Sequence, residues 1–244
     1  MILYIICIIG ILIGIYFLIS YCIFKTVKKN RNKNMTITAH SGCNYTKPNS
    51  IESLQDGYNS QADILEFDLN FDKRGVPYLS HDEIIGNEIK LEEAFKFLIN
   101  NPNVKANIDV KKIDNMPAVF HLINLYNLSN RVFFTGVKEE FVEAVRIGCP
   151  GIKYYLNYKP EFLKMNSQQY INQLVNKVKD CNAIGINIRH HFLSEKLIKT
   201  FHENKLLVSV WTINDNYFMQ RAIYYGPDNI TTKNPLQLRR LFME

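Results

Sequence analysis

Short apolar runs alternate with amphipathic segments along most of the chain. Runs rich in β-branched and aromatic residues predict strands. Segments whose apolar residues recur at helical spacing predict helices. The predicted strands cover residues 36–40, 64–70, 105–110, 132–135, 152–157, 183–188, 206–212 and 229–232. The predicted helices cover residues 51–59, 91–99, 117–126, 139–146, 169–179, 195–203 and 217–224, and a last helix begins near Pro235.

This alternation of strands and helices predicts an α/β fold, a (β/α)8 TIM-type barrel over residues 36–244. An open, doubly wound sheet is the alternative. It is less consistent with the sequence, because no glycine-rich phosphate loop follows the first predicted strand. The stretch 77–80, after a turn at 72–75, predicts a short hairpin attached to the second strand.

The N-terminal segment contains no charged residue from Ile2 to Phe24. A helix of about 20 apolar residues is long enough to cross a bilayer, and neither a basic start nor a small-residue cleavage site indicates a removed signal peptide. We therefore expect a single transmembrane helix over residues 1–24 and a basic, polar tether over residues 25–35. The chain is therefore expected to be a single-pass membrane protein. By the positive-inside rule, the basic tether after the helix places the barrel in the cytoplasm.

The net charge of +6 comes largely from this basic tether, and the rest of the chain is close to balanced. We therefore expect no nucleic-acid partner. The five cysteines show no metal-ligand spacing, which favours a reduced compartment over a disulfide framework.

Polar residues that could bind a metal or act in catalysis lie at the ends of the predicted strands, where barrel enzymes have their active sites. Glu66 and Asp68 are two apart on the second strand and so project from one face, as a site for Mg2+ or Ca2+ requires. His81 ends the next apolar stretch and could supply acid–base chemistry beside the metal. This pattern predicts a metal-assisted hydrolase. The other residues placed on these strands or at their ends are His40, Asn107, Asp109, Lys111, Lys153, Tyr155, Asn157 and Trp211.

Several motifs, in order along the chain, resemble the glycerophosphodiester phosphodiesterases. The motifs are His40-Ser41-Gly42, Asn49-Ser50-Ile51-Glu52-Ser53, and the stretches 62–68, 75–82, 107–111, 210–214 and 228–235. The resemblance implies the same barrel and the cleavage of glycerol phosphodiesters with a bound divalent cation.

The resemblance also implies roles for individual residues. It makes His40 and His81 the catalytic pair. Lys111 matches a lysine that faces the substrate phosphate, and Trp211 a residue on the glycerol side of the pocket. The metal ligands that it implies are Glu66, Asp68 and Asp109.

Three positions depart from the family pattern: Asp109 replaces a usual glutamate, Ser41 a usual arginine and Pro48 a usual glutamate. The loss of the arginine removes a bidentate phosphate partner. The replacement charge could come from Lys153, from Arg189 or from the histidine pair 190–191. Tyr155 belongs to an aromatic stretch that either contacts an acyl chain or packs the barrel.

The expected reaction converts a glycerophosphodiester into glycerol phosphate and an alcohol by general acid–base catalysis. The attacking group is either a neighbouring glycerol hydroxyl or water, and either histidine can be the base. Two other functions fit the same residues. One is lysophospholipase D-type action on membrane lysophospholipids, and the other is non-catalytic binding of a phosphorylated ligand.

Overall fold

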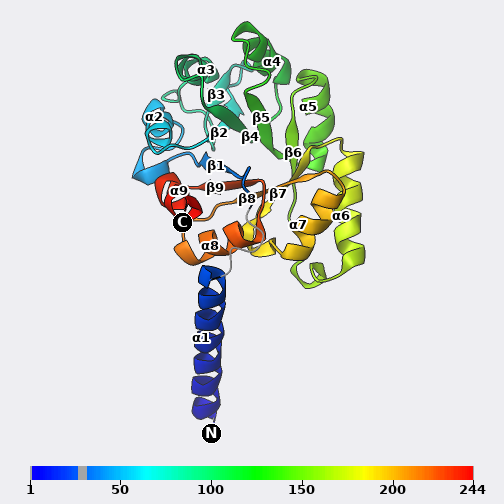
Figure 1. Ribbon diagram of the computed structural model, residues 1–244. Helices are drawn as coiled ribbons and strands as arrows, with labels where there is room; N and C mark the ends of the chain where they lie inside the picture. Colours follow the sequence, from blue (N-terminus) through cyan, green and yellow to red (C-terminus); the bar gives the residue numbers. More distant parts are fainter. Residues whose placement is uncertain (1, 27–31, 244) are drawn as a thin grey trace.

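The computed structural model describes the backbone of residues 2–26 and 32–243. Its strands form one sheet in the order β1-β9-β8-β7-β6-β5-β4-β2-β3, and an additional pairing of β1 with β2 closes it. Only β3 is antiparallel to its neighbour among these strands, so the eight parallel strands form a closed barrel (Figure 1). The strands are β1 Thr36–Ala39, β2 Ile64–Phe71, β3 Pro77–Leu79, β4 Lys105–Val110, β5 Val132–Val137, β6 Tyr154–Asn157, β7 Gly185–Arg189, β8 Leu207–Trp211 and β9 Asn229–Thr232.

A helix follows each barrel strand, directly or after the β3 hairpin, and the helices surround the sheet (Figure 1). The predicted α/β barrel is confirmed. The ends of its predicted helices and strands differ from the observed ones by three residues or fewer. The helices are α2 Ile51–Asn59, α3 Leu91–Asn100, α4 Met116–Leu125, α5 Val142–Gly148, α6 Gln168–Asp180, α7 Glu195–Glu203, α8 Asn216–Tyr225 and α9 Pro235–Met243.

The hydrophobic pattern explains why these elements form. All eight residues of β2 are buried, as expected for a parallel strand that is covered on both faces. On α7, Leu197, Ile198 and Phe201 are buried and Lys199 is exposed, so one stripe of the helix packs on the sheet. The Ser194 side chain caps this helix by accepting a hydrogen bond from the Leu197 N–H.

The predicted hairpin is also confirmed. Pro77–Leu79 forms β3, which pairs antiparallel with the end of β2. The chain then continues to His81, just beyond the hairpin. Because β2 extends past its barrel neighbours into this hairpin, His81 is carried to the C-terminal end of the barrel.

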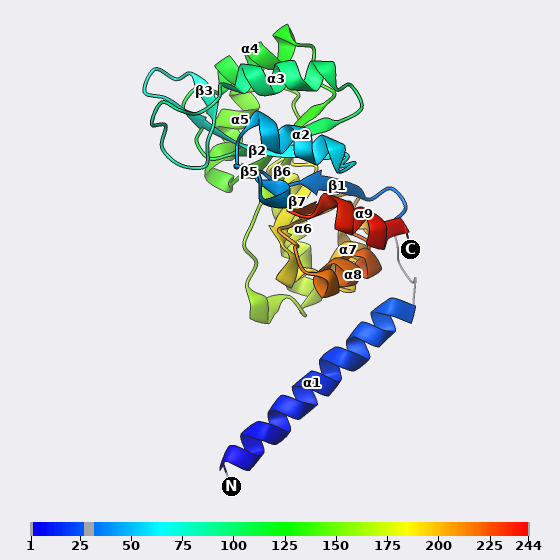
Figure 2. The ribbon, with the colours of Figure 1, turned by 90° about the vertical axis from the view of Figure 1, so that its left-hand side faces the viewer.

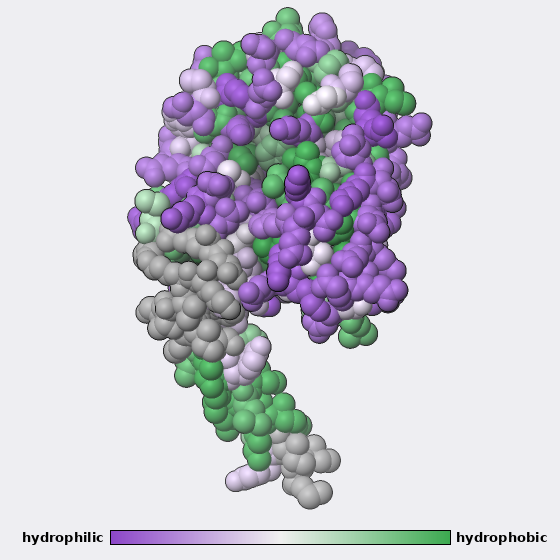
Figure 3. Space-filling view, turned by 45° about the vertical axis from the view of Figure 1, so that its right-hand side comes forward, coloured by the Kyte–Doolittle hydropathy of each residue, from purple (hydrophilic) through white to green (hydrophobic). Residues whose placement is uncertain are grey.

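Helix α1 (Ile2–Thr26) projects from the barrel below α8 (Figures 1 and 2). The Phe17 and Tyr217 rings meet edge to face with their centroids 5.9 Å apart, which joins α1 to α8. The described side chains of α1 are exposed and mostly apolar, as the green surface of the projection in Figure 3 shows.

Across residues 2–26 and 32–243, no helix combines the length and the apolar character that crossing a bilayer requires. The prediction of a single-pass membrane protein is therefore wrong. The predicted cytoplasmic orientation depended on a transmembrane helix, so it no longer has support. The predicted tether lies partly outside the described residues, at 27–31.

Candidate active site

Two adjacent barrel strands, β2 and β4, bring three carboxylates together. Glu66 and Asp68 lie on β2, and Asp109 on β4 is the register partner of Asp68. One ligand oxygen from each of the three lies within 4.8 Å of the others. Glu66 and Asp68 are buried, and Asp109 is partly exposed. The structure thus places the three expected metal ligands in one cluster.

The cluster is electrostatically suited to a cation. Burial raises the pKa of Glu66 well above its ordinary value, and the nearby charges of Asp68 and Asp109 raise it further. The Ser41 N–H donates to Glu66 Oε2 at 2.7 Å and partly offsets this effect. Three carboxylates that repel one another and offer only oxygen donors fit a hard divalent cation.

The ammonium of Lys111 lies between two of these carboxylates. Its Nζ is 2.9 Å from Asp68 Oδ1 and 2.6 Å from Asp109 Oδ2. Burial alone lowers the pKa of Lys111, but the charges of Asp109 and Asp68 outweigh it and raise the pKa above its ordinary value. Lys111 is therefore charged and neutralises part of the cluster.

His40 follows β1 and lines the same pocket. Its Nδ1 lies 2.7 Å from the Ser41 carbonyl oxygen and 4.0 Å from Glu66 Oε2. A carbonyl only accepts, so this hydrogen bond places the proton on Nδ1 and leaves a lone pair on Nε2. Burial lowers the pKa of His40 below 6.5, and the hydrogen bond to Ser41 only partly counteracts it. His40 is therefore a neutral imidazole at pH 7.

His81 lines the pocket from its outer edge. Its side chain is 66% exposed, and Nδ1 donates to Asp82 Oδ1 at 3.0 Å. A proton on Nδ1 shared with a carboxylate fixes the tautomer and the orientation of the ring. The two histidines thus lie in different environments, one partly buried beside the carboxylates and one exposed to solvent.

Ser41 and Asn49 hold the carboxylates from the loop after β1. The Asn49 amide donates to Asp68 Oδ2 at 2.8 Å and accepts from the Asp68 N–H at 2.9 Å. Ser41 Oγ accepts from the Asn49 N–H at 2.6 Å and donates to the Asn49 side chain at 3.1 Å. Ser41, at the position of the family arginine, therefore organises the loop rather than presenting a charge.

The pocket has a volume of about 410 Å3. Lys111 and Trp211, the two substrate contacts expected from the motifs, both line it. Thr135 Oγ1 donates to Asn107 at 2.8 Å, and Asn187 donates to Asn157 at 2.6 Å, so paired polar side chains from β4 to β7 form part of its wall.

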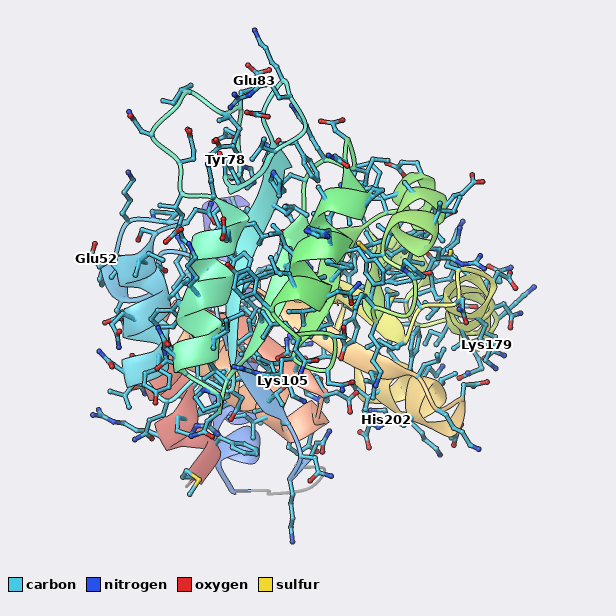
Figure 4. The ribbon with its side chains drawn as sticks, turned by 90° about the horizontal axis from the view of Figure 1, so that it is seen from above. Glu52, Tyr78, Glu83, Lys105, Lys179 and His202 are labelled. Carbon is cyan, nitrogen blue, oxygen red and sulfur yellow. The ribbon has the colours of Figure 1, made fainter. Side chains whose placement is uncertain are left out.

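A larger cavity, of about 760 Å3, lies at the other end of the barrel beside His202 and Asp228. Figure 4 shows the two ends: Lys105, at the start of β4, and His202 lie at one, and Tyr78 on β3 lies at the other. The larger cavity lacks the carboxylate cluster. The smaller pocket, which contains the cluster, is therefore the candidate active site.

The structure does not bring Lys153 and Tyr155 to this pocket. Lys153 precedes β6 and lines a separate cavity beside Arg146 and Cys149. Tyr155 is buried, and burial, followed by the charge of Asp228, raises its pKa above the ordinary value. Lys153 comes just before β6 and Tyr155 is its second residue, so both residues lie towards the N-terminal end of this strand.

Several pocket residues were not predicted from the sequence. Thr135 and Asn187 line the pocket, as does Lys138 just after β5. A signal for Asn187 was present, because it is two residues before Arg189 on β7 and strand alternation places both on one face. Asn49 belongs to a recognised motif, but only the structure shows its contacts with Asp68.

Solved structures of similar fold include proteins described as phosphodiesterases. A glycerophosphodiester phosphodiesterase from Parabacteroides distasonis has a TM-score of 0.72 at 18% identity and covers 87% of this chain and 98% of its own. One from Agrobacterium tumefaciens has a TM-score of 0.69 at 15% identity, with 84% and 99% covered. A phosphodiesterase from Oleispira antarctica, in complex with the product sn-glycerol-3-phosphate, has a TM-score of 0.71 at 14% identity, with 86% and 97% covered. These identities establish likeness of fold.

No curated protein sequence matches the chain. The model of the glycerophosphoryl diester phosphodiesterase family, however, matches residues 87–237, more than half of the chain. The match includes Asp109, Lys111 and Trp211 and begins after His81, so the first half of the pocket stands on its geometry alone. This chain therefore belongs to the glycerophosphoryl diester phosphodiesterase family and is a phosphoric diester hydrolase.

Proposed function

We propose that this enzyme hydrolyses glycerophosphodiesters to glycerol phosphate and an alcohol, with a divalent cation held by Glu66, Asp68 and Asp109. The convergence of these carboxylates with His40 and His81 on one pocket carries the proposal. We assign the catalytic domain to residues 36–244, which contain the complete barrel.

The donor set supports Mg2+ or Ca2+ rather than zinc, because it consists of carboxylate oxygens without histidine or cysteine. When bound, such an ion polarises a phosphodiester oxygen as a Lewis acid. Lys111 is placed between Asp68 and Asp109, so it can turn from these carboxylates to the substrate phosphate when the ion takes over their neutralisation.

The environments of the histidines support different roles for them. His40 is neutral at pH 7 and has a lone pair on Nε2, so we assign it as the base that takes the proton of the attacking hydroxyl or water. His81 is held by Asp82 at the exposed edge, where a leaving alcohol departs, so we assign it as the acid that protonates that alcohol. Trp211 lines the opposite wall and bounds the substrate there.

The test is product release by the full chain, purified without metal. We would supply glycerophosphodiesters and lysophospholipids in separate assays, with Mg2+, Ca2+ or a chelator, and follow glycerol phosphate and alcohol. We expect metal-dependent hydrolysis of glycerophosphodiesters. We also expect His40→Ala and His81→Ala to lower the rate by about 10²–10⁴, the usual contribution of a positioned acid or base.

His121→Ala is the matched control, because His121 is exposed on α4 and lies outside the pocket. Its rate should equal that of the unmodified chain. Full turnover in His40→Ala would refute the assignment of the base. A folded, metal-loaded enzyme that releases product from none of the glycerophosphodiesters would refute the proposed function.

A further inference from the structure

The inside of the barrel is polar where β6, β7 and β8 run below the pocket. Barrel interiors are normally filled by branched apolar side chains. Here the strand register aligns two amides and a hydroxyl in one row, with Asn187 between Asn157 and Ser209. Asn187 and Ser209 are both buried. Buried polar groups are normally hydrogen-bonded, because an unpaired one keeps the full cost of its lost hydration.

Most of this row is bonded within the barrel. Ser209 Oγ accepts from Asn229 Nδ2 at 3.0 Å, and Asn229 Oδ1 accepts from Thr38 Oγ1 at 2.7 Å. The Asn187 amide donates from Nδ2 to Asn157 Oδ1 at 2.6 Å. Its other atom, Oδ1, is buried and has no hydrogen-bond partner in the part of the chain that the structure describes. Asn187 therefore has an acceptor that a ligand can use.

The neighbouring strand β8 has a donor in the same condition. Among residues 2–26 and 32–243, the buried Trp211 Nε1 has no hydrogen-bond partner either. Arg189 lies over the face of this ring, 5.4 Å from its centroid, and so leaves the N–H in the ring plane unused. Asn187 and Trp211 both line the pocket. Because Asn187 is the register partner of Ser209, two residues before Trp211, the two side chains are diagonal neighbours on one face.

An unpaired acceptor beside an unpaired donor favours a hydroxyl group as the ligand. A hydroxyl both donates and accepts, so it suits Asn187 Oδ1 as well as Trp211 Nε1. Phosphate and ester oxygens only accept, and an ammonium only donates, so each of these would leave one of the two atoms unpaired. The χ2 torsion of asparagine is broad, so Asn187 can turn Oδ1 towards a hydroxyl that enters the pocket.

The position of this pair indicates which part of the substrate it meets. In the closed sheet, β7 lies four strands from β2 in either direction, and the hairpin of β2 leads to His81. In the proposed function, His81 protonates the leaving alcohol. The glycerol, which stays on the phosphate, then lies on the opposite side, towards Asn187 and Trp211. Its central hydroxyl is next to the carbon that bears the phosphate, so the terminal hydroxyl reaches further towards this wall.

We propose that Asn187, together with Trp211, binds the terminal hydroxyl of the glycerol and thereby selects substrates in which this hydroxyl is free. The inference rests on the proposed function and adds a specificity-determining residue to it. An acyl chain on this oxygen, as in a lysophospholipid, removes the proton that Asn187 Oδ1 accepts. The same contact therefore disfavours lysophospholipids as substrates.

The test compares three phosphocholine diesters that all keep the central hydroxyl. They are glycerophosphocholine, its analogue propane-1,2-diol phosphocholine without the terminal hydroxyl, and 1-hexanoyl lysophosphatidylcholine, whose short chain keeps it dissolved. We would measure kcat/KM for each with the full chain and Mg2+ or Ca2+. We expect glycerophosphocholine to exceed each of the others by about 10–100-fold, the effect of leaving a buried acceptor unpaired.

Asn187→Leu keeps the approximate size of the side chain and removes the acceptor. It should abolish the preference for glycerophosphocholine over the deoxy analogue by slowing the former. Asn229→Leu is the matched control, because Asn229 is also buried but its Oδ1 is bonded to Thr38 and it lies outside the pocket. This control should keep the preference. Each ratio comes from one protein preparation, so any loss of folded protein cancels.

Binding of the product gives a second readout, which does not depend on turnover. The chain contains a single tryptophan, so its fluorescence reports on Trp211 itself. We expect glycerol phosphate to bind the Ca2+-loaded full chain about 10–100-fold more tightly than propane-1,2-diol phosphate, which lacks the terminal hydroxyl. In Asn187→Leu the two compounds should bind equally.

Failure of the inference can be distinguished from failure of the proposed function. Equal kcat/KM of the unmodified chain on glycerophosphocholine and its deoxy analogue would overturn the inference and leave the proposed function standing. An unchanged preference in Asn187→Leu would do the same, as would faster hydrolysis of the hexanoyl compound than of glycerophosphocholine. If none of the three is hydrolysed and glycerol phosphate does not change the fluorescence, both the inference and the proposed function are wrong.

Discussion

Replacing Lys111 with methionine tests the electrostatics of the carboxylate cluster. The substitution keeps the length of the side chain and removes the ammonium that contacts Asp68 and Asp109 at 2.9 and 2.6 Å. Lys111 and Asp68 are 24% and 8% exposed, so water replaces little of the lost interaction. Removing one partner from such a buried pair costs about 3–5 kcal/mol of unfolding free energy.

For a domain of this size, each kcal/mol lowers the melting temperature by about 2–4 °C. At the lower end of the cost, Lys111→Met in chelator should therefore melt about 6–12 °C below the unmodified chain. A divalent ion should close most of this gap. An ion at 100 times its Kd adds about 2.7 kcal/mol, and in the variant it meets no competing ammonium, so its binding is tighter.

The assay is thermal unfolding followed by circular dichroism, in chelator and across a Mg2+ or Ca2+ titration. Lys96→Met is the matched control, because Lys96 also contacts two carboxylates, those of Glu92 and Glu93, at 3.4 and 2.9 Å. It is 48% exposed, so water screens these contacts and their loss should lower the melting temperature far less than Lys111→Met does. Equal melting temperatures for Lys111→Met and the unmodified chain in chelator would refute the reasoning, as would equal stabilisation of both by the ion.

Three further predictions follow from other contacts. Asn49→Gly removes two hydrogen bonds to Asp68 while tolerating the positive φ of 56°, and should weaken divalent-ion binding about 10–100-fold by calorimetry. Gly136→Ala places a methyl group against the Asp109 carboxylate at a φ of 71°, and should cost more than about 1 kcal/mol in denaturant unfolding and lower the metal-dependent rate. Burial, together with the adjacent histidine, lowers the pKa of His190 to about 4, so only the unfolded chain takes up this proton as the pH falls from 6.5 towards 4. The unmodified chain should lose about 1 kcal/mol more stability than His190→Gln between pH 7 and pH 5, measured by urea unfolding; equal losses would contradict this prediction.

The barrel was predictable because its hydrophobic signals are strong and local. The strand β2 alternates apolar residues with polar ones, and helices such as α7 show one apolar stripe. The carboxylates of Glu66 and Asp68 were placed on one face by alternation alone. Asp109 meets them because β4 is the neighbour of β2 with Asp68 opposite it.

Alternation fails where position along the strand matters. Alternation shows which face of β6 a side chain lies on, but not how far along the barrel axis it lies. Lys153 and Tyr155 were therefore expected beside Asn157, whereas of these three residues Asn157 lines the pocket. The contacts of Asn49 could not be predicted from the sequence for a related reason. Its amide meets Asp68 through a loop with a left-handed backbone, which no periodic pattern encodes.

The order of the strands divides the pocket between the two halves of the chain. The carboxylates, both histidines and Lys111 all come from residues 40–111, whereas Lys138, Arg189 and Trp211 come from later strands and loops. The groups that we propose for the reaction therefore lie on one stretch of sequence, and the residues of the facing wall lie on another. Under the proposed function, substitutions after residue 111, or a half-barrel exchanged with a relative, would reshape that wall while leaving in place the groups assigned to bond cleavage. Such an exchange is a way for this barrel to acquire new substrates while its chemistry is preserved.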